Sequence, residues 1–145
     1  MTSNQTLSAW ALPVGPVEVL RVLLADSDPE VRQTVRLVAT RHGHEIIFAA
    51  TGAEALTQAA AASPNLIVLD TVFPDADGRE VLARLKADPV TAPIPVVVWS
   101  GGREERPSDR QLALELGAED YVDMVNAELL VRRLERVYLR LSAKA

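Results

Sequence analysis

Short apolar runs that stop at polar residues recur along the chain, separated by segments in which apolar residues return every three or four positions. The clearest run is Leu66–Leu69, where four apolar residues follow one another without alternation and end at Asp70. A run this short, bounded by turn residues, predicts a strand buried on both faces of a sheet. The predicted strands cover residues 19–25, 46–49, 66–69, 95–99 and 121–122.

The segments between these runs carry helix signals. Pro29 suits the first turn of a helix, and either Ser27 or Asp28 can cap it. Thr51 and Glu54 have the spacing of a capping box. The five predicted helices run from Pro29 to Gly43, from Thr51 to about Ala61, onward from Gly78, up to Gly117, and from about Ala127 to Leu141.

The alternation of five strands with five helices predicts an α/β fold. We expect a doubly wound five-stranded parallel sheet with helices on both faces. The flavodoxin-like order 2-1-3-4-5 is common among such sheets, and it places strands one and three side by side where the winding reverses. Asp26 follows the first strand and Asp70 ends the third. Their carboxylates are therefore expected to meet in one small anionic pocket, with Asp70 open to solvent.

Composition narrows the classes of function. A net charge of −5 offers no footprint for nucleic acid or an anionic membrane. The absence of cysteine excludes disulfides, thiolate metal sites and a cysteine nucleophile. No apolar run reaches membrane-spanning length, and the N-terminus lacks the basic start of a signal peptide, so a cytoplasmic location is expected. Lysine is scarce, because only Lys86 and Lys144 occur.

The first residues differ in character from the rest of the chain. Two prolines and a glycine within residues 13–16 forbid a regular element there. We expect residues 1–17 to form a flexible extension and residues 18–142 to form the folded domain. A second interpretation stays open, in which Trp10 and Leu12 dock on the domain or on a partner.

Four motifs lie in order at the ends of predicted elements. They are Val22–Arg32, Leu66–Asp70 with Pro74 and Asp77-Gly78, Val98–Gly101, and Gly117–Tyr121. Together they resemble the receiver domain of response regulators, the chemotaxis CheY type. The resemblance covers nearly everything except the extension. It implies a CheY-like fold and a role in two-component (phosphorelay) signal transduction as a phosphoprotein rather than an enzyme.

The resemblance also implies a role for particular residues. Asp70 would accept a phosphoryl group from the phosphohistidine of a histidine kinase or phosphotransfer protein. Mg²⁺ would be held by Asp26, Asp70 and the backbone carbonyl of Val72. Ser100 would bond to the phosphoryl group, and Tyr121 would be the aromatic residue that reports it by swinging inward.

Two departures from the family pattern affect these roles. Ser27 stands where receivers carry a second acid that binds the metal, so Mg²⁺ binding should be weak. Met124 and Val125 stand where the family has a lysine and a proline. A charge-assisted hydrogen bond such as that lysine makes contributes roughly 1.5–3 kcal/mol. We therefore expect an atypical receiver whose switching is blunted.

Three functions compete at this stage. The first is a stand-alone receiver phosphorylated on Asp70, since no output domain follows Leu141. The second is a phosphorylation-independent pseudo-receiver that acts as a protein–protein interaction module. In both, a downstream protein would dock on the face made by the fourth helix, the fifth strand and the fifth helix. The family also uses the fourth and fifth helices for homodimers.

The third function is an enzyme, a haloacid-dehalogenase phosphatase. Asp26-Ser27-Asp28 fits the Asp-x-Asp motif of that class, and Val98–Ser100 fits its second motif. That class needs a lysine downstream of the serine and room for a cap domain, and this chain offers only Lys144. We discount it. The two histidines, His42 and His44, flank a glycine at a helix end and are expected to be solvated.

Overall fold

The structure, a computed structural model, describes residues 19–101, 106–123 and 126–144. The predicted extension at residues 1–17 lies outside the described residues, as do Met124 and Val125. The strands are β1 (Arg21–Ala25), β2 (Glu45–Ala49), β3 (Leu66–Asp70), β4 (Val96–Trp99) and β5 (Asp120–Val122). The helices are α2 (Pro29–Arg41), α3 (Gly52–Ala62), α4 (Gly78–Ala87), α5 (Pro107–Glu115) and α6 (Ala127–Lys144).

The strands form one parallel sheet in the order β2-β1-β3-β4-β5, which confirms the predicted topology. β3 lies in the centre, between β1 and β4. Every residue of β3 is buried, which confirms the prediction for the apolar run Leu66–Leu69 but not the expectation that Asp70 is open to solvent. In the register of the sheet, Ala25 pairs with Leu69 and Asp70 pairs with Trp99.

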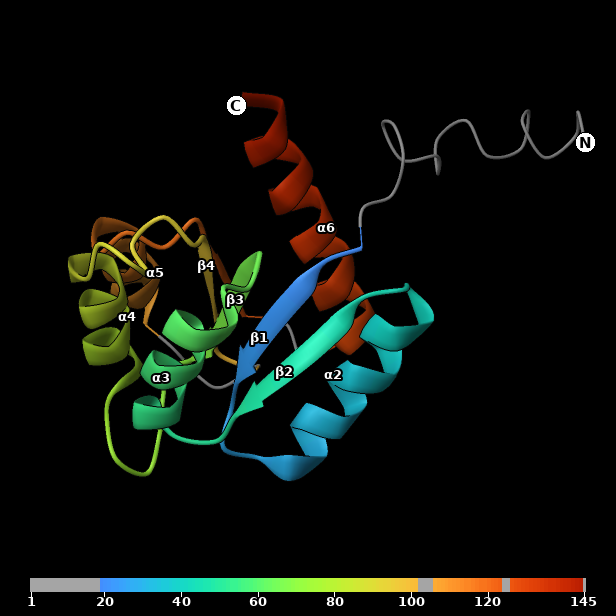
Figure 1. The fold of residues 1–145 in the computed structure, drawn as a ribbon. Coiled ribbons are helices and arrows are strands. Elements are labelled where there is room, and N and C mark those ends of the chain that lie inside the picture. The colour runs from blue at the N-terminus through green and yellow to red at the C-terminus, as the bar shows by residue number, and fades with distance from the viewer. Residues whose placement is uncertain (1–18, 102–105, 124–125, 145) are drawn as a thin grey trace, which may run out of the picture.

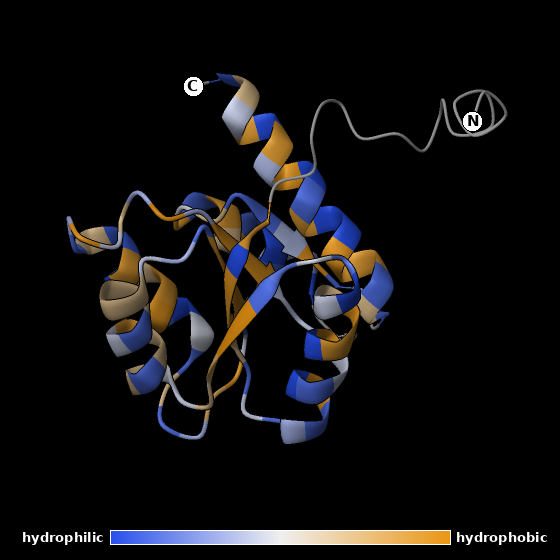
Figure 2. Cartoon of the chain, turned by 45° about the vertical axis from the view of Figure 1, so that its right-hand side comes forward, coloured by the Kyte–Doolittle hydropathy of each residue, from blue (hydrophilic) through white to orange (hydrophobic). Residues whose placement is uncertain are grey.

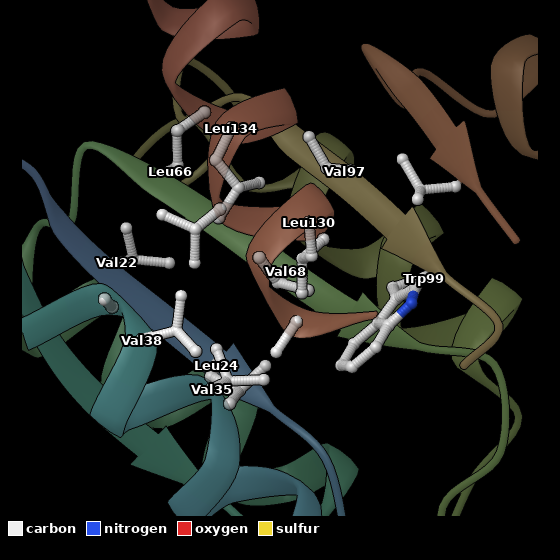
Figure 3. Close-up of a cluster of buried hydrophobic side chains, with 14 of the residues drawn as sticks. Val22, Leu24, Val35, Val38, Leu66, Val68, Val97, Trp99, Leu130 and Leu134 are labelled. Atoms are coloured by element: carbon white, nitrogen blue, oxygen red, sulfur yellow. The ribbon is translucent and has the colours of Figure 1, made fainter. Parts of the chain in front are cut away.

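Helices cover both faces of the sheet. α2 and α6 lie on one face, and α3, α4 and α5 lie on the other (Figure 1). Alternate side chains of β3 pack into the cores on the two faces of the sheet. Leu66 and Val68 belong to the core beneath α2 and α6 (Figure 3), and Ile67 and Leu69 belong to the core beneath the other three helices. The strands are mostly hydrophobic, with polar residues at some of their ends, whereas the helices carry polar stripes on their outer faces (Figure 2).

Some local details differ from the sequence-based expectations. α6 continues past Leu141 to Lys144. The expectation of a solvated pair of histidines is wrong for His44. That residue is 6% exposed, and its Nδ1 accepts a hydrogen bond from Leu20 N–H at 3.1 Å.

Within the described ranges, none of the helices has both the length and the apolar character required to cross a bilayer.

Replacing Leu66 by alanine tests the central position of β3. The side chain is fully buried, so Leu66→Ala should lower the free energy of unfolding by about 2–5 kcal/mol through lost burial and an unfilled cavity. Leu129→Ala is the matched control, since Leu129 is 48% exposed and should cost well under about 1 kcal/mol. Urea unfolding followed by circular dichroism measures both, and equal costs would contradict the assigned packing.

Candidate functional site

Two acidic residues lie side by side at the point where the winding of the sheet reverses. Because Ala25 and Leu69 are paired, the residues that follow them, Asp26 and Asp70, leave the sheet at the same level on neighbouring strands. Asp26 is 5% exposed and Asp70 is 2% exposed. The structure therefore brings the two predicted acids to one place, but it leaves them much less open to solvent than expected.

Asp26 is held by contacts from three directions. Its N–H donates to the carbonyl of Ala49 at 2.9 Å, which extends the β1–β2 pairing by one residue. Its Oδ1 accepts from the N–H of Asp28 at 2.9 Å, which is an Asx-type turn. Its carbonyl accepts from Nη1 of Arg32 at 2.7 Å. The carboxylate thus has a fixed position at the start of the β1–α2 connection.

Arg32 is a contributor to the site that sequence reasoning missed. Besides bonding to the Asp26 carbonyl, its guanidinium lies over the ring of Phe48 at 5.7 Å from the centroid. α2 is thereby joined to both β1 and β2 beside the acidic pair. The hydrophobic periodicity of the sequence does not predict this contact, because Arg32 and Phe48 meet only once the helix has packed on the sheet.

Asp70 opens a tight connection to α4. Its Oδ1 accepts from the N–H of Thr71 at 2.7 Å, and the carbonyl of Thr71 accepts from the N–H of Gly78 at 2.9 Å. The chain folds back so closely that a Cβ atom built on Gly78 would lie 2.2 Å from the carbonyl oxygen of Asp70. Only glycine fits there, which explains the Asp-Gly pair at the start of α4.

The loop between Asp70 and α4 is tied to two helices. Asp75 accepts from the N–H groups of Gly52 and Ala53 at 2.9 and 3.1 Å, so it caps α3 from a distance. The Gly52 bond, followed by that of Ala53, lowers the pKa of Asp75. Asp77 caps α4, and its side-chain bond from Arg79 lowers the pKa of Asp77. The sequence indicated turn chemistry at both acids but not the reach of Asp75 to α3.

Val72 lies within this loop, two residues beyond Asp70. It forms an isolated antiparallel bridge with Asp77, and the residue is 56% exposed. Thr71, Val72, Arg79 and Tyr121 are among the residues that line a pocket of about 290 Å³ between α4 and α5. The pocket begins beside the acidic pair rather than at it, since neither Asp26 nor Asp70 lines it.

The hydroxyl residues come from the next two strands. Ser100 follows β4, is fully buried, and its N–H donates to the carbonyl of Val122 at 3.0 Å. Because Trp99 pairs with Asp70, Ser100 leaves the sheet one position past the level of Asp70. Tyr121 is 5% exposed within the core beneath α3, α4 and α5. Its carbonyl accepts from Nη1 of Arg110 at 2.8 Å.

Of the two lysines in the described residues, Lys144 is exposed at the end of α6, and Lys86 is remote from the acids. Nζ of Lys86 donates to the carbonyls of Ala92 and Ile94 at 3.0 and 2.8 Å, and burial lowers the pKa of Lys86. Those carbonyls precede β4, so Lys86 lies at the edge of the sheet opposite Asp70. It is not placed to take over the role of the lysine that Met124 replaces, and Met124 itself lies outside the described residues.

Few oxygen ligands for a hard cation such as Mg²⁺ lie beside Asp26 and Asp70. Mg²⁺ is commonly bound through one or two carboxylates, with water and substrate phosphate as the remaining ligands. Asp26 and Asp70 supply that minimum. Among the described residues there is no group of three or more histidine, aspartate or glutamate side chains arranged to hold a metal ion.

The fold and the site together define a class, a flavodoxin-like domain with an acidic pair at its switch point. The model of the response regulator receiver domain matches residues 22–135. The transcriptional regulatory protein KdpE of Mycobacterium tuberculosis is 40% identical over 101 residues, 70% of this chain and 42% of that protein. The phosphate regulon transcriptional regulatory protein PhoB of Escherichia coli is 32% identical over 126 residues, 86% of this chain and 54% of that protein.

A solved structure gives the same result. The chemotaxis response regulator CheY4 of Vibrio cholerae superposes with a TM-score of 0.74 at 28% identity, covering 83% of this chain and 99% of that one. The chain belongs to the response regulator receiver domain family. It spans roughly half the length of the curated relatives named above. Receiver domains are signalling modules of two-component systems and are not, in general, enzymes.

Gly78→Ala should disturb the site and the fold together. The added methyl group meets backbone atoms of Asp70 and Thr71, so we expect a loss of at least about 2 kcal/mol in the free energy of unfolding. Gly52→Ala is the control, because there the nearest atom is a side-chain methyl of Val81 at 2.9 Å. Urea unfolding of both variants measures the difference, and a Gly78→Ala cost no larger than the control would contradict the geometry of the loop.

Proposed function

We propose that Asp70 is the phosphoacceptor of this receiver domain, and that Mg²⁺ binding and switching are weaker than in a receiver with the full set of site residues. The observation that carries this proposal is the adjacent placement of Asp26 and Asp70 at the switch point of the sheet. A carboxylate oxygen of Asp70 would form a bond to phosphorus while the phosphorus–nitrogen bond of the donor's phosphohistidine breaks. The product on this chain is an acyl phosphate.

The chain's own residues have distinct parts in that step. Thr71 N–H donates to Oδ1 of Asp70 and so orients the carboxylate. Ser100 is the hydroxyl that we assign to the transferred phosphoryl group, because it follows the strand that pairs with Asp70. Tyr121 is the aromatic residue that we assign to the readout. Its ring belongs to the same buried core as Leu69 and Phe73, on either side of Asp70.

Mg²⁺ would be held by the carboxylates of Asp26 and Asp70 and by the backbone carbonyl of Val72. It supplies neutralisation of charge between an anionic acceptor and an anionic donor. Ser27 brings no charge to this set, so binding falls short of that of a three-acid site. The position of Lys86 at the far edge of the sheet supports a weak switch as well.

One observation favours the second function, a pseudo-receiver that binds partners without phosphorylation. Asp70 is only 2% exposed, so a phosphoryl donor reaches it only after a local rearrangement. Under either function a histidine kinase, a phosphotransfer protein or a downstream partner would contact the domain. We assign the output contact to the face formed by α5, β5 and α6, which is also the candidate surface for a homodimer. Regulation of transcription is said only of the named relatives.

Incubation with acetyl phosphate and Mg²⁺ separates the two functions. If Asp70 is a phosphoacceptor, the intact mass of the chain should increase by one phosphoryl group, and the adduct should be lost in mild alkali because it is an acyl phosphate. Asp70→Asn should abolish the adduct, and Asp75→Asn, which alters a nearby acid outside the pair, should retain it. No adduct on the unaltered chain would favour the pseudo-receiver.

Introducing the two residues that the family pattern has at positions 27 and 124 tests why Mg²⁺ binding and switching should be weak. Ser27→Asp together with Met124→Lys should raise the Mg²⁺ affinity and the yield of the adduct, about tenfold or more if each contributes a charge-assisted contact. The fluorescence of Trp99 during a Mg²⁺ titration measures the affinity, in a background where Trp10 is replaced by phenylalanine. The single variants apportion the gain. An unchanged titration in the double variant would contradict the roles given to both positions.

A further inference from the structure

A cluster of histidines and glutamates joins α6 to the corner between α2 and β2, on the opposite side of the molecule from α3, α4 and α5. His42 Nε2 lies 2.7 Å from Oε2 of Glu128, and His42 Nδ1 lies 3.2 Å from Oε2 of Glu135. His44 Nε2 lies 2.6 Å from the same oxygen of Glu135. Both glutamates belong to α6, so two turns of that helix are fastened to one corner.

The hydrogen-bond partners determine the proton on each ring. Leu20 N–H donates to Nδ1 of His44, so that nitrogen is an acceptor and the proton of a neutral ring lies on Nε2, facing Glu135. His42 differs, because a carboxylate oxygen faces each of its two nitrogens. Ionised carboxylates only accept hydrogen bonds, so both contacts of His42 are hydrogen bonds only when the ring is a protonated imidazolium.

The surroundings of His42 are predominantly acidic. The α6 side presents Glu128 and Glu135, and Nε of Arg132 lies 3.5 Å from Glu128. The residue before β2 contributes the ring of His44, stacked on His42 at 6.3 Å between centroids. α2 contributes Arg41 in its own last turn. The His42 side chain is 24% exposed, so it exchanges protons with solvent, whereas the His44 side chain is 2% exposed.

We propose that His42 is a pH-dependent clamp on α6, which fastens the helix to the α2–β2 corner when the ring is protonated and releases it when the proton is lost. Histidine side chains exchange this proton near neutral pH. After deprotonation one ring nitrogen presents a lone pair to a carboxylate, so an attraction becomes a repulsion. The clamp therefore weakens as the pH rises through the neutral range.

The glutamates determine the lowest pH at which the clamp still holds. The hydrogen bond from His42 is the largest cause that lowers the pKa of Glu128, so this carboxylate stays ionised to lower pH than an ordinary glutamate. Its stabilising contribution is present at neutral pH and is lost only as the pH falls through that lowered pKa. The clamp is strongest at mildly acidic pH, where the imidazolium and both carboxylates coexist.

α6 carries this effect to the rest of the domain. Its first residue, Ala127, lines a pocket with Asp28 and Trp99 at the start of α2. Leu130, in the first turn of α6, belongs to the same buried core as Trp99 (Figure 3). A change in how firmly the helix is held is therefore expected at the same edge of the sheet as the acidic pair.

Urea unfolding over a range of pH tests the clamp. Between about pH 6 and about pH 8.5 the unfolding constant of the unaltered chain should rise roughly fivefold relative to His42→Gln, which carries no titrating ring. Glu45→Gln is the control, because its partner Arg21 does not titrate in this range. The ratio of the unaltered chain to that control should stay flat. A flat ratio for His42→Gln as well would overturn the proposal.

Two further measurements make the test specific to α6. The chain has only two histidines, so ¹⁵N spectra resolve both rings and His42→Gln assigns them. At the acidic end of the range we expect a His42 signal with protons on both nitrogens, because a carboxylate oxygen faces each of them, and this signal should be lost as the pH rises. Amide exchange of α6, taken relative to α3 at each pH, should speed up as the pH rises, and it should not do so in His42→Gln. A His42 without both protons at the acidic end of the range, or equal pH responses of the two helices, would overturn the proposal.

Discussion

The burial of β3 on both faces is the constraint on which the rest of the structure depends. A strand that is apolar in every position except the last can only lie between two other strands, under helices on both sides. Its single acid then emerges where the apolar run stops. In β1 a buried apolar run, Val22–Ala25, follows the exposed Arg21, and the residue after this run emerges at the same level. The acidic pair is thus a consequence of where two hydrophobic runs end.

The loops around the pair are set by polar contacts rather than by apolar burial. Asp75 joins the β3–α4 loop to α3, and Arg32 joins α2 to the backbone of Asp26. Gly78 permits the close return of the chain past Asp70. These contacts fix the backbone on either side of Asp26 and Asp70, and they do not involve Ser27 or Met124. The receiver fold does not depend on the acid and the lysine that the family pattern predicts at positions 27 and 124, where this chain has Ser27 and Met124.

The sequence predicted the strand order and the adjacent placement of Asp26 and Asp70. Both follow from the alternation of strands with helices and from the residues at which the apolar runs stop. It did not predict Arg32, Asp75 or the His42 cluster as parts of the structure. Each depends on segments that are distant along the chain, such as His42 and Glu135, and approach only after the helices have packed. It also misjudged His44, because its buried partner is a backbone N–H that no side-chain pattern reveals.

Burial of Asp70 and phosphorylation of Asp70 make opposite demands on the same pocket. Carboxylates that share a buried edge repel one another, and each loses hydration, so a third acid raises the cost of closing the pocket without a cation. Ser27 removes that third charge. With Ser27 at that position, Asp26 and Asp70 are both buried, and each accepts a hydrogen bond from a backbone N–H, of Asp28 and of Thr71. Of the two functions proposed above, this lower cost of closing the pocket favours the partner-binding pseudo-receiver.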